Sequence, residues 1–138
     1  MIWSKDFTLE ELNKENKLCK NPFQIEFIEK GDDFLRAKMP VNKNTKQPMG
    51  LLHGGASVFL AETIGSVSGH LCVRQEGRVV VGLDINANHL RGVREGFVYA
   101  KSIPIHIGGK TQVWSIEITN EEGKMVCVSR LTLAVVSF

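Results

Sequence analysis

The sequence predicts an α+β domain of two layers, in which one long helix covers an antiparallel sheet. A nearly uncharged apolar stretch in the middle of the chain is long enough for a single extended helix, and the segments after it have strand character. The last three of those segments are separated by short turns rich in glycine and asparagine, which favours an antiparallel meander. With 138 residues, 43% of them hydrophobic, we expect a single domain spanning residues 1–138.

The first part of the chain predicts a short helix followed by a hairpin. Thr8 and Glu11 have the spacing of a capping box, in which the Thr8 hydroxyl accepts a backbone N–H and Glu11 reaches back, so a helix is expected from Leu9 to Leu18. Two alternating segments around the turn Gly31-Asp32-Asp33 then predict a pair of strands, Phe23 to Glu29 and Phe34 to Met39. A loop from Pro40 to Gly50 follows.

The second part predicts the long helix and four strands. The helix should run from about Gly54 to Val73, and the strands are expected at Val79 to Leu90, Gly96 to Ile107, Thr111 to Thr119 and Met125 to Val136. A single sheet with one covering helix keeps an exposed edge and part of an open face. This arrangement favours pairing with a second copy of the chain.

Composition narrows the possible partners. The net charge is +2, with 17 basic and 15 acidic side chains and no basic run, which argues against nucleic acid. Three scattered cysteines, Cys19, Cys72 and Cys127, suit free thiols in a reducing cytoplasm, and the first residues do not resemble a signal peptide. The charge and the glycines of the long helix make a membrane span unexpected.

One charge stands out in the long apolar stretch. Residues 47 to 73 carry a single ionised side chain, Glu62, with no cation near it in sequence. Keeping a carboxylate among apolar side chains costs on the order of several kcal/mol or raises its pKa, which indicates a function. We interpret Glu62 as the reactive group of an active site and His53-Gly54-Gly55 as its other half; the alternative is that Glu62 simply reaches solvent.

A helical wheel separates a small face from a bulky one. Gly55, Val58, Gly65, Ser66 and Gly69 lie near Glu62, whereas Leu60, Ile64, Val67 and Leu71 lie on the far side. The bulky face should pack on the sheet. The small face allows close approach of a helix, a strand or a ligand, or it only permits tight packing.

The start of the same helix is a candidate oxyanion site. Free N–H groups and the positive end of the helix dipole gather there, and glycines let a carbonyl oxygen come close, although a glycine turn that only begins a helix is an equal alternative. Gly54 and Glu62 are separated by about 12 Å along the helix axis, so one carbonyl can hardly touch both. If both serve one site, Glu62 must face Gly54 of a partner chain, which predicts a dimer with two shared sites.

These residues carry a resemblance to the hotdog-fold thioesterases that extends nearly end to end. The matching segments are Gln47-Pro48, Leu52 to Gly55, Ala61 to Ser66, Gly82 to His89 and Val128 to Thr132. The chain most resembles bacterial acyl-CoA thioesterases of the 4-hydroxybenzoyl-CoA type, which include the 1,4-dihydroxy-2-naphthoyl-CoA hydrolases of menaquinone synthesis. The resemblance implies a sheet wrapped around a central helix and paired units.

The resemblance also implies roles for individual residues. Glu62 is the nucleophile or the base that activates water, the Gly54 N–H polarises the thioester carbonyl with His53 and Gln47 nearby, and Ser66 orients the carboxylate or its water. The regions that hold the CoA part of the substrate match Gly82, His89, Leu90, Arg91, Gly92, His106, Gly108, Gly109 and Arg130. Taken without the resemblance, the glycine pair at 108–109 is typical of a hairpin turn, and the arginines are typical of solvated surface.

We therefore expect a cytoplasmic thioesterase that acts on an aromatic or bulky acyl-CoA and forms a dimer or a dimer of dimers. No cofactor is expected beyond the CoA of the substrate, and the histidines and cysteines lack the spacing of a metal site. Two alternatives remain at this stage: a non-catalytic acyl-CoA or acyl-carrier binding module, and a hotdog dehydratase.

Overall fold

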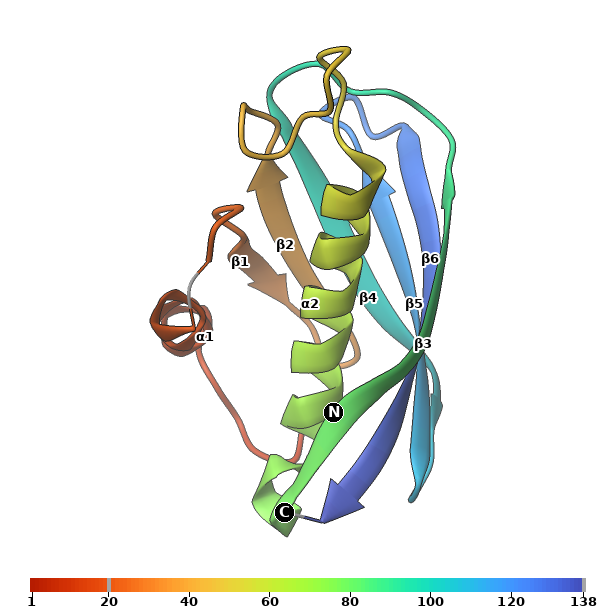
Figure 1. The fold of residues 1–138 in the computed structure, drawn as a ribbon. Helices are drawn as coiled ribbons and strands as arrows, with labels where there is room; N and C mark the ends of the chain where they lie inside the picture. Colours follow the sequence, from red (N-terminus) through yellow and green to blue (C-terminus); the bar gives the residue numbers. More distant parts are fainter. Residues whose placement is uncertain (20, 138) are drawn as a thin grey trace.

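The computed structural model describes residues 1–19 and 21–137 and contains two α-helices, a 3-10 turn and six strands (Figure 1). In chain order these are α1 (Leu9–Leu18), β1 (Glu26–Lys30), β2 (Leu35–Pro40), α2 (Gly54–Val73), η1 (Arg74–Glu76), β3 (Arg78–His89), β4 (Phe97–Ile107), β5 (Thr111–Thr119) and β6 (Met125–Ser137). The predicted bounds of α1 and α2 are confirmed, as is the helix-hairpin-helix-meander order.

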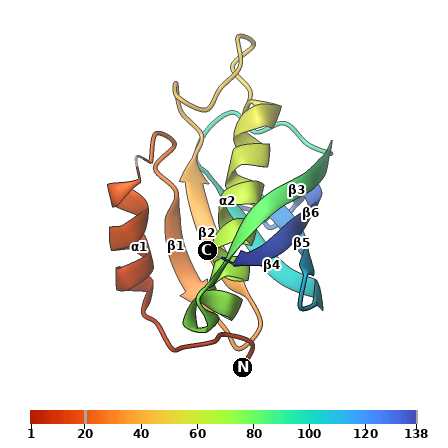
Figure 2. The same cartoon turned by 60° about the horizontal axis from the view of Figure 1, so that its bottom comes forward.

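The strands form one antiparallel sheet in the order β1-β2-β4-β5-β6-β3, so β1 and β3 are its two edges. The sheet curves around α2, which lies along its inner face (Figure 1). In both ribbon views α1 lies beside β1, on the side of α2 that faces away from β3 (Figure 2). The predicted two-layer α+β architecture with one long central helix is confirmed.

The α2 helix packs on the sheet through both bulky and small residues. Leu60 and Ile64 have no exposed surface. Two glycines of the small face also meet the sheet, because a Cβ on Gly65 would lie 2.6 Å from Leu131 and a Cβ on Gly69 would lie 2.5 Å from Leu133. Strands β5 and β6 therefore pack closely against the small face at Gly65 and Gly69.

The helix α1 closes the β1 edge of the sheet. The capping box is present, with the Glu11 N–H donating to the Thr8 hydroxyl and the Thr8 N–H donating to the Glu11 carboxylate. The side-chain amide of Asn13 donates to the Phe27 carbonyl at 3.0 Å and accepts from the Phe27 N–H at 2.7 Å. Asn13 thus replaces a neighbouring strand at this edge, which stabilises the position of α1.

The predicted start of the first strand is wrong. Residues Phe23 to Ile25 are outside β1, because the side-chain amide of Asn21 binds both backbone groups of Ile25 and Gln24 has a positive φ of 56°. Phe23 instead packs edge-on against Phe59 of α2, with ring centroids 5.0 Å apart. The segment belongs to the surroundings of α2 rather than to the sheet.

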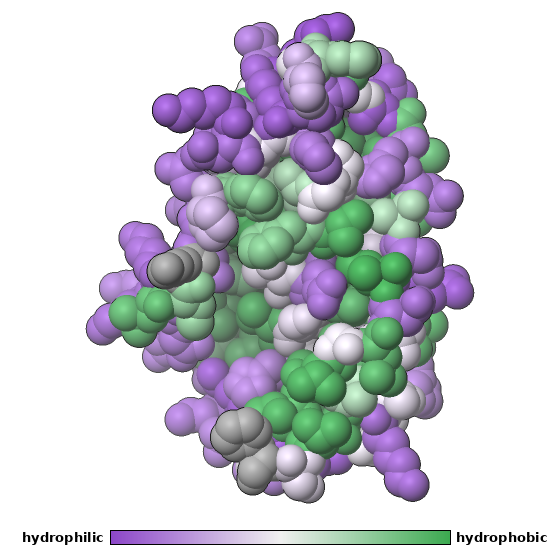
Figure 3. Space-filling model, in the orientation of Figure 1, coloured by the Kyte–Doolittle hydropathy of each residue, from purple (hydrophilic) through white to green (hydrophobic). Residues whose placement is uncertain are grey.

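Strand β3 is hydrogen-bonded to β6 on one side only within the described chain. Its side chains Val81 and Leu83 are exposed, and Figure 3 shows an apolar band along the face that carries α2 and β3, bordered by hydrophilic side chains. Residues Gly54–Glu76 are also long and apolar enough, by length and composition alone, to cross a bilayer, but most of that segment is buried within the fold like a core helix.

Candidate active site

The N-terminus of α2 is organised by His53. This residue is the N-cap, and its Nδ1 accepts the Gly55 N–H at 2.8 Å. Its carbonyl accepts the N–H groups of Ala56 and Ser57. Of the four N–H groups that begin the helix, only that of Gly54 has no acceptor within the described chain. A single free donor therefore remains at the positive end of the helix dipole.

A cavity of about 440 Å³ opens beside this free donor. It brings together several of the predicted residues, and its lining includes Gln47, Gly54, His89, Leu90, Arg91 and Gly92. His89, the last residue of β3, lies directly over Gly54, since a Cβ at position 54 would be 3.0 Å from the His89 Nε2. The strand register thus places an imidazole against Gly54.

Backbone hydrogen bonds fix the loops around this cavity. The His53 N–H donates to the Thr45 carbonyl at 2.7 Å, and the Leu52 N–H donates to the Val93 carbonyl at 2.8 Å. The Gln47 side-chain oxygen accepts from the Met49 N–H at 2.5 Å, which holds the turn before the helix. The donor at Gly54 is therefore positioned by its surroundings before any ligand arrives.

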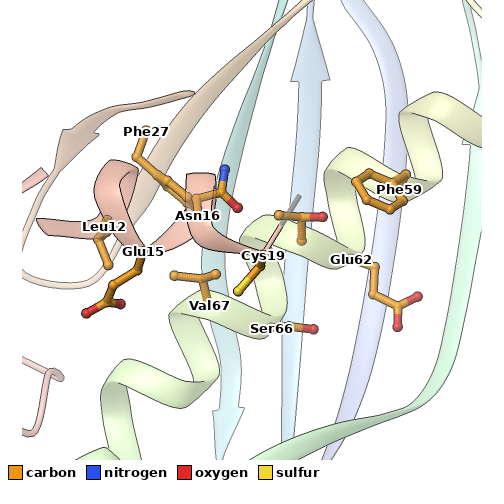
Figure 4. Close-up of a pocket in the computed structure, with 10 residues that line it drawn as sticks. Leu12, Glu15, Asn16, Cys19, Phe27, Phe59, Glu62, Ser66 and Val67 are labelled. Carbon is orange, nitrogen blue, oxygen red and sulfur yellow. The ribbon is translucent and has the colours of Figure 1, made fainter. Parts of the chain in front are cut away.

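Glu62 lines a different cavity, of about 600 Å³, together with Ser66 (Figure 4). Its carboxylate is half-buried and contacts β3, because a Cβ on Gly82 would lie 2.8 Å from the Glu62 Oε2. None of the ion pairs within the described chain involves Glu62. Glu62 therefore has no ion-pair partner among the described residues, and its surroundings are more open than the full burial that the sequence suggested.

The two halves of the predicted site are therefore separate on one chain. The Gly54 donor and the Glu62 carboxylate line two different cavities, two turns of α2 apart. A carbonyl held by the donor has an electrophilic carbon, and an unpaired carboxylate can attack such a carbon or take a proton from water. The chemistry suits acyl transfer, but one chain does not present both groups to one carbonyl.

A comparison with known families decides the class of protein. Residues 49–127, which contain α2 and most of the sheet, match the family described as Thioesterase superfamily. This chain belongs to the thioesterase superfamily. The matched segment includes both Gly54 and Glu62. Each of the two cavities of this thioesterase is therefore lined in part by residues of the matched segment.

Similar proteins agree with that assignment. The 1,4-dihydroxy-2-naphthoyl-CoA hydrolase of Escherichia coli is 54% identical over 98% of this chain and 99% of its own length. A proofreading thioesterase of Cronobacter turicensis is 47% identical over 98% of both chains. A thioesterase structure from Haemophilus influenzae superposes with a TM-score of 0.93 at 55% identity, covering 99% of this chain and 96% of that one. The hotdog fold and the thioesterase class are confirmed, against the alternatives of a dehydratase and a non-catalytic module.

Several of the residues that the family resemblance suggested for CoA lie away from both cavities of the thioesterase. His106 lies at the end of β4, and Gly108 and Gly109 form the β4–β5 connection, at the opposite end of the sheet from Gly54. There the Arg78 side chain donates to the Gly109 carbonyl at 2.8 Å. Arg130 is exposed on β6. Within one chain these residues meet neither Gly54 nor Glu62.

The cysteines of the thioesterase fall into two kinds. Burial raises the pKa of the Cys72 thiol to about 12, and burial also raises the pKa of the Cys127 thiol. Cys19 is exposed. No group of three or more histidine, cysteine or acidic side chains that could hold a metal ion occurs in residues 1–19 and 21–137.

Residues of the N-terminal part also belong to the site region, which the sequence did not indicate. The 600 Å³ cavity is lined on one side by α1 and β1, through Leu12, Glu15, Asn16, Cys19 and Phe27. These residues are distant in sequence from Glu62 and carry no motif. Only the path of the chain between α1 and β1 brings them opposite α2.

Proposed function

We propose that this thioesterase hydrolyses an aromatic or otherwise bulky acyl-CoA, and that two chains together complete each active site. The observation that carries the proposal is the one unused N–H at the start of α2, Gly54, in a cavity separate from the one that holds the unpaired carboxylate of Glu62. A second chain related by a two-fold axis brings Gly54 of one chain to Glu62 of the other.

The proposed reaction needs few groups because thiolate is a good leaving group. The Gly54 N–H polarises the thioester carbonyl, with His53 and Gln47 fixing the loop and helix start. The Glu62 carboxylate either attacks the carbonyl carbon or takes a proton from the attacking water. Ser66, one turn further along α2, orients the carboxylate or the water. Direct attack expels the CoA thiolate and leaves a mixed anhydride on Glu62, which a water molecule then hydrolyses; attack by water forms the free acid in one addition and elimination. Both routes break the C–S bond and end with the free acid, CoA and the regenerated carboxylate.

The name of one similar protein supports an aromatic substrate. One relative at 54% identity is named for hydrolysis of 1,4-dihydroxy-2-naphthoyl-CoA, an intermediate of menaquinone synthesis, so this ester is our first candidate. The cavity beside Gly54, with His89, Leu90, Arg91 and Gly92, is the proposed entrance for the CoA part. The predicted CoA contacts from Gly82, His106, Gly108, Gly109 and Arg130 remain part of this proposal.

The proposed assembly is a dimer or a dimer of dimers in the cytoplasm. The free edge of β3 and its exposed apolar side chains support pairing of two copies through this strand. We propose that the reaction uses no metal and no cofactor apart from the CoA of the substrate, and that neither nucleic acid nor a membrane is a partner. The small net charge of +2 fits the expectation that nucleic acid is not a partner.

Replacing the carboxylate tests the proposed role of Glu62. Glu62→Gln keeps the size of the side chain but removes the nucleophile or base, so kcat should fall by at least about 100-fold. Binding of a non-hydrolysable CoA thioether should change little. Release of CoA is best measured by chromatography, because the exposed Cys19 thiol also reacts with thiol reagents.

Glu117→Gln is a matched control, because Glu117 is an exposed residue of β5 with the same change of charge. This variant should hydrolyse 1,4-dihydroxy-2-naphthoyl-CoA at the wild-type rate. If Glu62→Gln retains near-normal turnover, Glu62 has no part in the mechanism.

A further inference from the structure

The cavity that contains Glu62 has two walls of different origin. One wall is the face of α2 that carries Phe59, Glu62, Thr63, Ser66 and Val67. The opposite wall is built by the α1 side and β1, with Leu12, Glu15, Asn16, Cys19 and Phe27. Figure 4 shows Leu12 and Asn16 on the α1 side and Ser66 and Glu62 on α2. At about 600 Å³ the cavity is in the usual size range of small-molecule sites.

Only one of these walls lies in the segment that matches the family model, residues 49–127. All five α2 residues lie within the matched residues 49–127, whereas all five residues of the opposite wall precede residue 49. The reactive carboxylate is therefore on the shared wall. The wall that faces it precedes the matched segment, although similar proteins aligned over nearly the whole chain include it.

The opposite wall is held by few interactions. Leu12 is the only residue of α1 that is buried. Leu9 is partly buried against the core, and polar side chains add the two bonds of Asn13 to Phe27 and the bond of Asn16 to the Ile25 carbonyl at 3.1 Å. Leu12 belongs to the core, but the exposed side chains on this side of the cavity, Glu15 and Cys19, can change without altering the core around α2.

The lining indicates the kind of group that the cavity accepts. Leu12, Phe27, Phe59 and Val67 make it largely apolar, and the amide of Asn16 is already bound to backbone. Two carboxylates, Glu15 and Glu62, line it, and no cationic side chain does so among the described residues. A neutral apolar acyl group fits this environment, whereas an acyl group with a second carboxylate is repelled.

From these observations, and resting on the proposed function, we propose that α1 is the specificity wall of the acyl pocket. The thioester carbon lies at Glu62, and a bulky neutral acyl group extends from there across the cavity to Leu12 and Cys19. A short acyl group does not reach α1. The side chains on this face of α1 thus select the acyl group, while α2 carries the reaction.

A substitution at Cys19 tests this proposal with little risk to the fold, because Cys19 is exposed at the end of α1. Cys19→Trp fills the pocket from the α1 side. We expect kcat/KM for 2-naphthoyl-CoA to fall by about ten- to 200-fold, the range for a misfit in an apolar pocket, while kcat/KM for acetyl-CoA stays unchanged. Leu18→Trp is the matched control, because the neighbouring Leu18 side chain is 80% exposed and does not line the cavity; it should not change either value.

The outcomes separate the two proposals. If the wild type hydrolyses neither ester, the proposed function is overturned. If the wild type hydrolyses 2-naphthoyl-CoA and Cys19→Trp does so equally well, or loses both esters in equal proportion, the specificity wall is overturned.

Chemical labelling gives a second test that does not depend on folding of a variant. The Cys72 and Cys127 thiols are buried with raised pKa values, so N-phenylmaleimide should modify Cys19 in the folded wild type, as checked by peptide mass. Labelling should lower 2-naphthoyl-CoA hydrolysis and leave acetyl-CoA hydrolysis intact. The reagent should have no effect on the rate of Cys19→Ser. Unchanged naphthoyl-CoA hydrolysis by fully labelled protein contradicts the proposal.

Discussion

The position of the Glu62 carboxylate depends on a glycine of the neighbouring strand. A Cβ at residue 82 would lie 2.8 Å from the Glu62 Oε2, and the β3–β6 register shifts just after it, between Gly82 and Asp84. Register shifts of this kind are typical next to active sites, where they redirect a strand. Gly82 therefore provides the space in which the carboxylate rests.

Gly82→Ala should move the carboxylate without unfolding the protein. The atom that the new methyl group meets is the free end of a flexible side chain, so we expect a small change in Tm. Because a displacement of about 1 Å in a reacting group can cost about 100-fold in rate, kcat should fall substantially. A Gly82→Ala enzyme with full kcat would show that the carboxylate works equally well in another position.

At the scale of the element, the start of α2 combines a cap, a dipole and a single free donor. His53 uses three of the four initial N–H groups through its ring and its carbonyl. Its backbone is extended, with ψ of 130°, a conformation that also suits a residue before proline. Proline is well tolerated at the first position of a helix, so the substitution Gly54→Pro can remove this free N–H selectively.

Comparison of Gly54→Pro with Gly54→Ala isolates this donor. Both variants place a Cβ against the His89 ring, but only proline removes the N–H. Loss of one oxyanion donor typically costs about 100-fold or more in kcat, so Gly54→Pro should be slower than Gly54→Ala by about that factor. Equal rates for the two variants would mean that the N–H does not polarise the carbonyl.

The sequence predicted those elements whose signals are local. The capping box located α1, and the apolar stretch behind His53 located α2. The start of β1 failed because the Asn21 side chain takes the backbone groups that a strand needs, which no alternation of residues reveals. The contact of His89 with Gly54, and the wall that α1 forms opposite Glu62, depend on strand register and chain path, so sequence spacing could not show them.

At the scale of the whole molecule, one chain keeps the two halves of the proposed site apart. The rise of a helix already separated Gly54 from Glu62, and the structure places them in two cavities on α2. Along the same face, β3 has a free edge and exposed apolar side chains, Val81 and Leu83. A two-fold pairing of chains through this edge would cover the apolar surface and complete two sites at once.

Mixed dimers of Glu62→Gln and Gly54→Pro chains test this central claim directly. If each site takes Glu62 from one chain and Gly54 from the other, a mixed dimer has one site with both changes and one site with neither. Mixed dimers purified with two different affinity tags should therefore recover about half of the wild-type turnover per dimer, although each parent is nearly inactive. No recovery in dimers shown by mass to contain both chains would contradict the shared site.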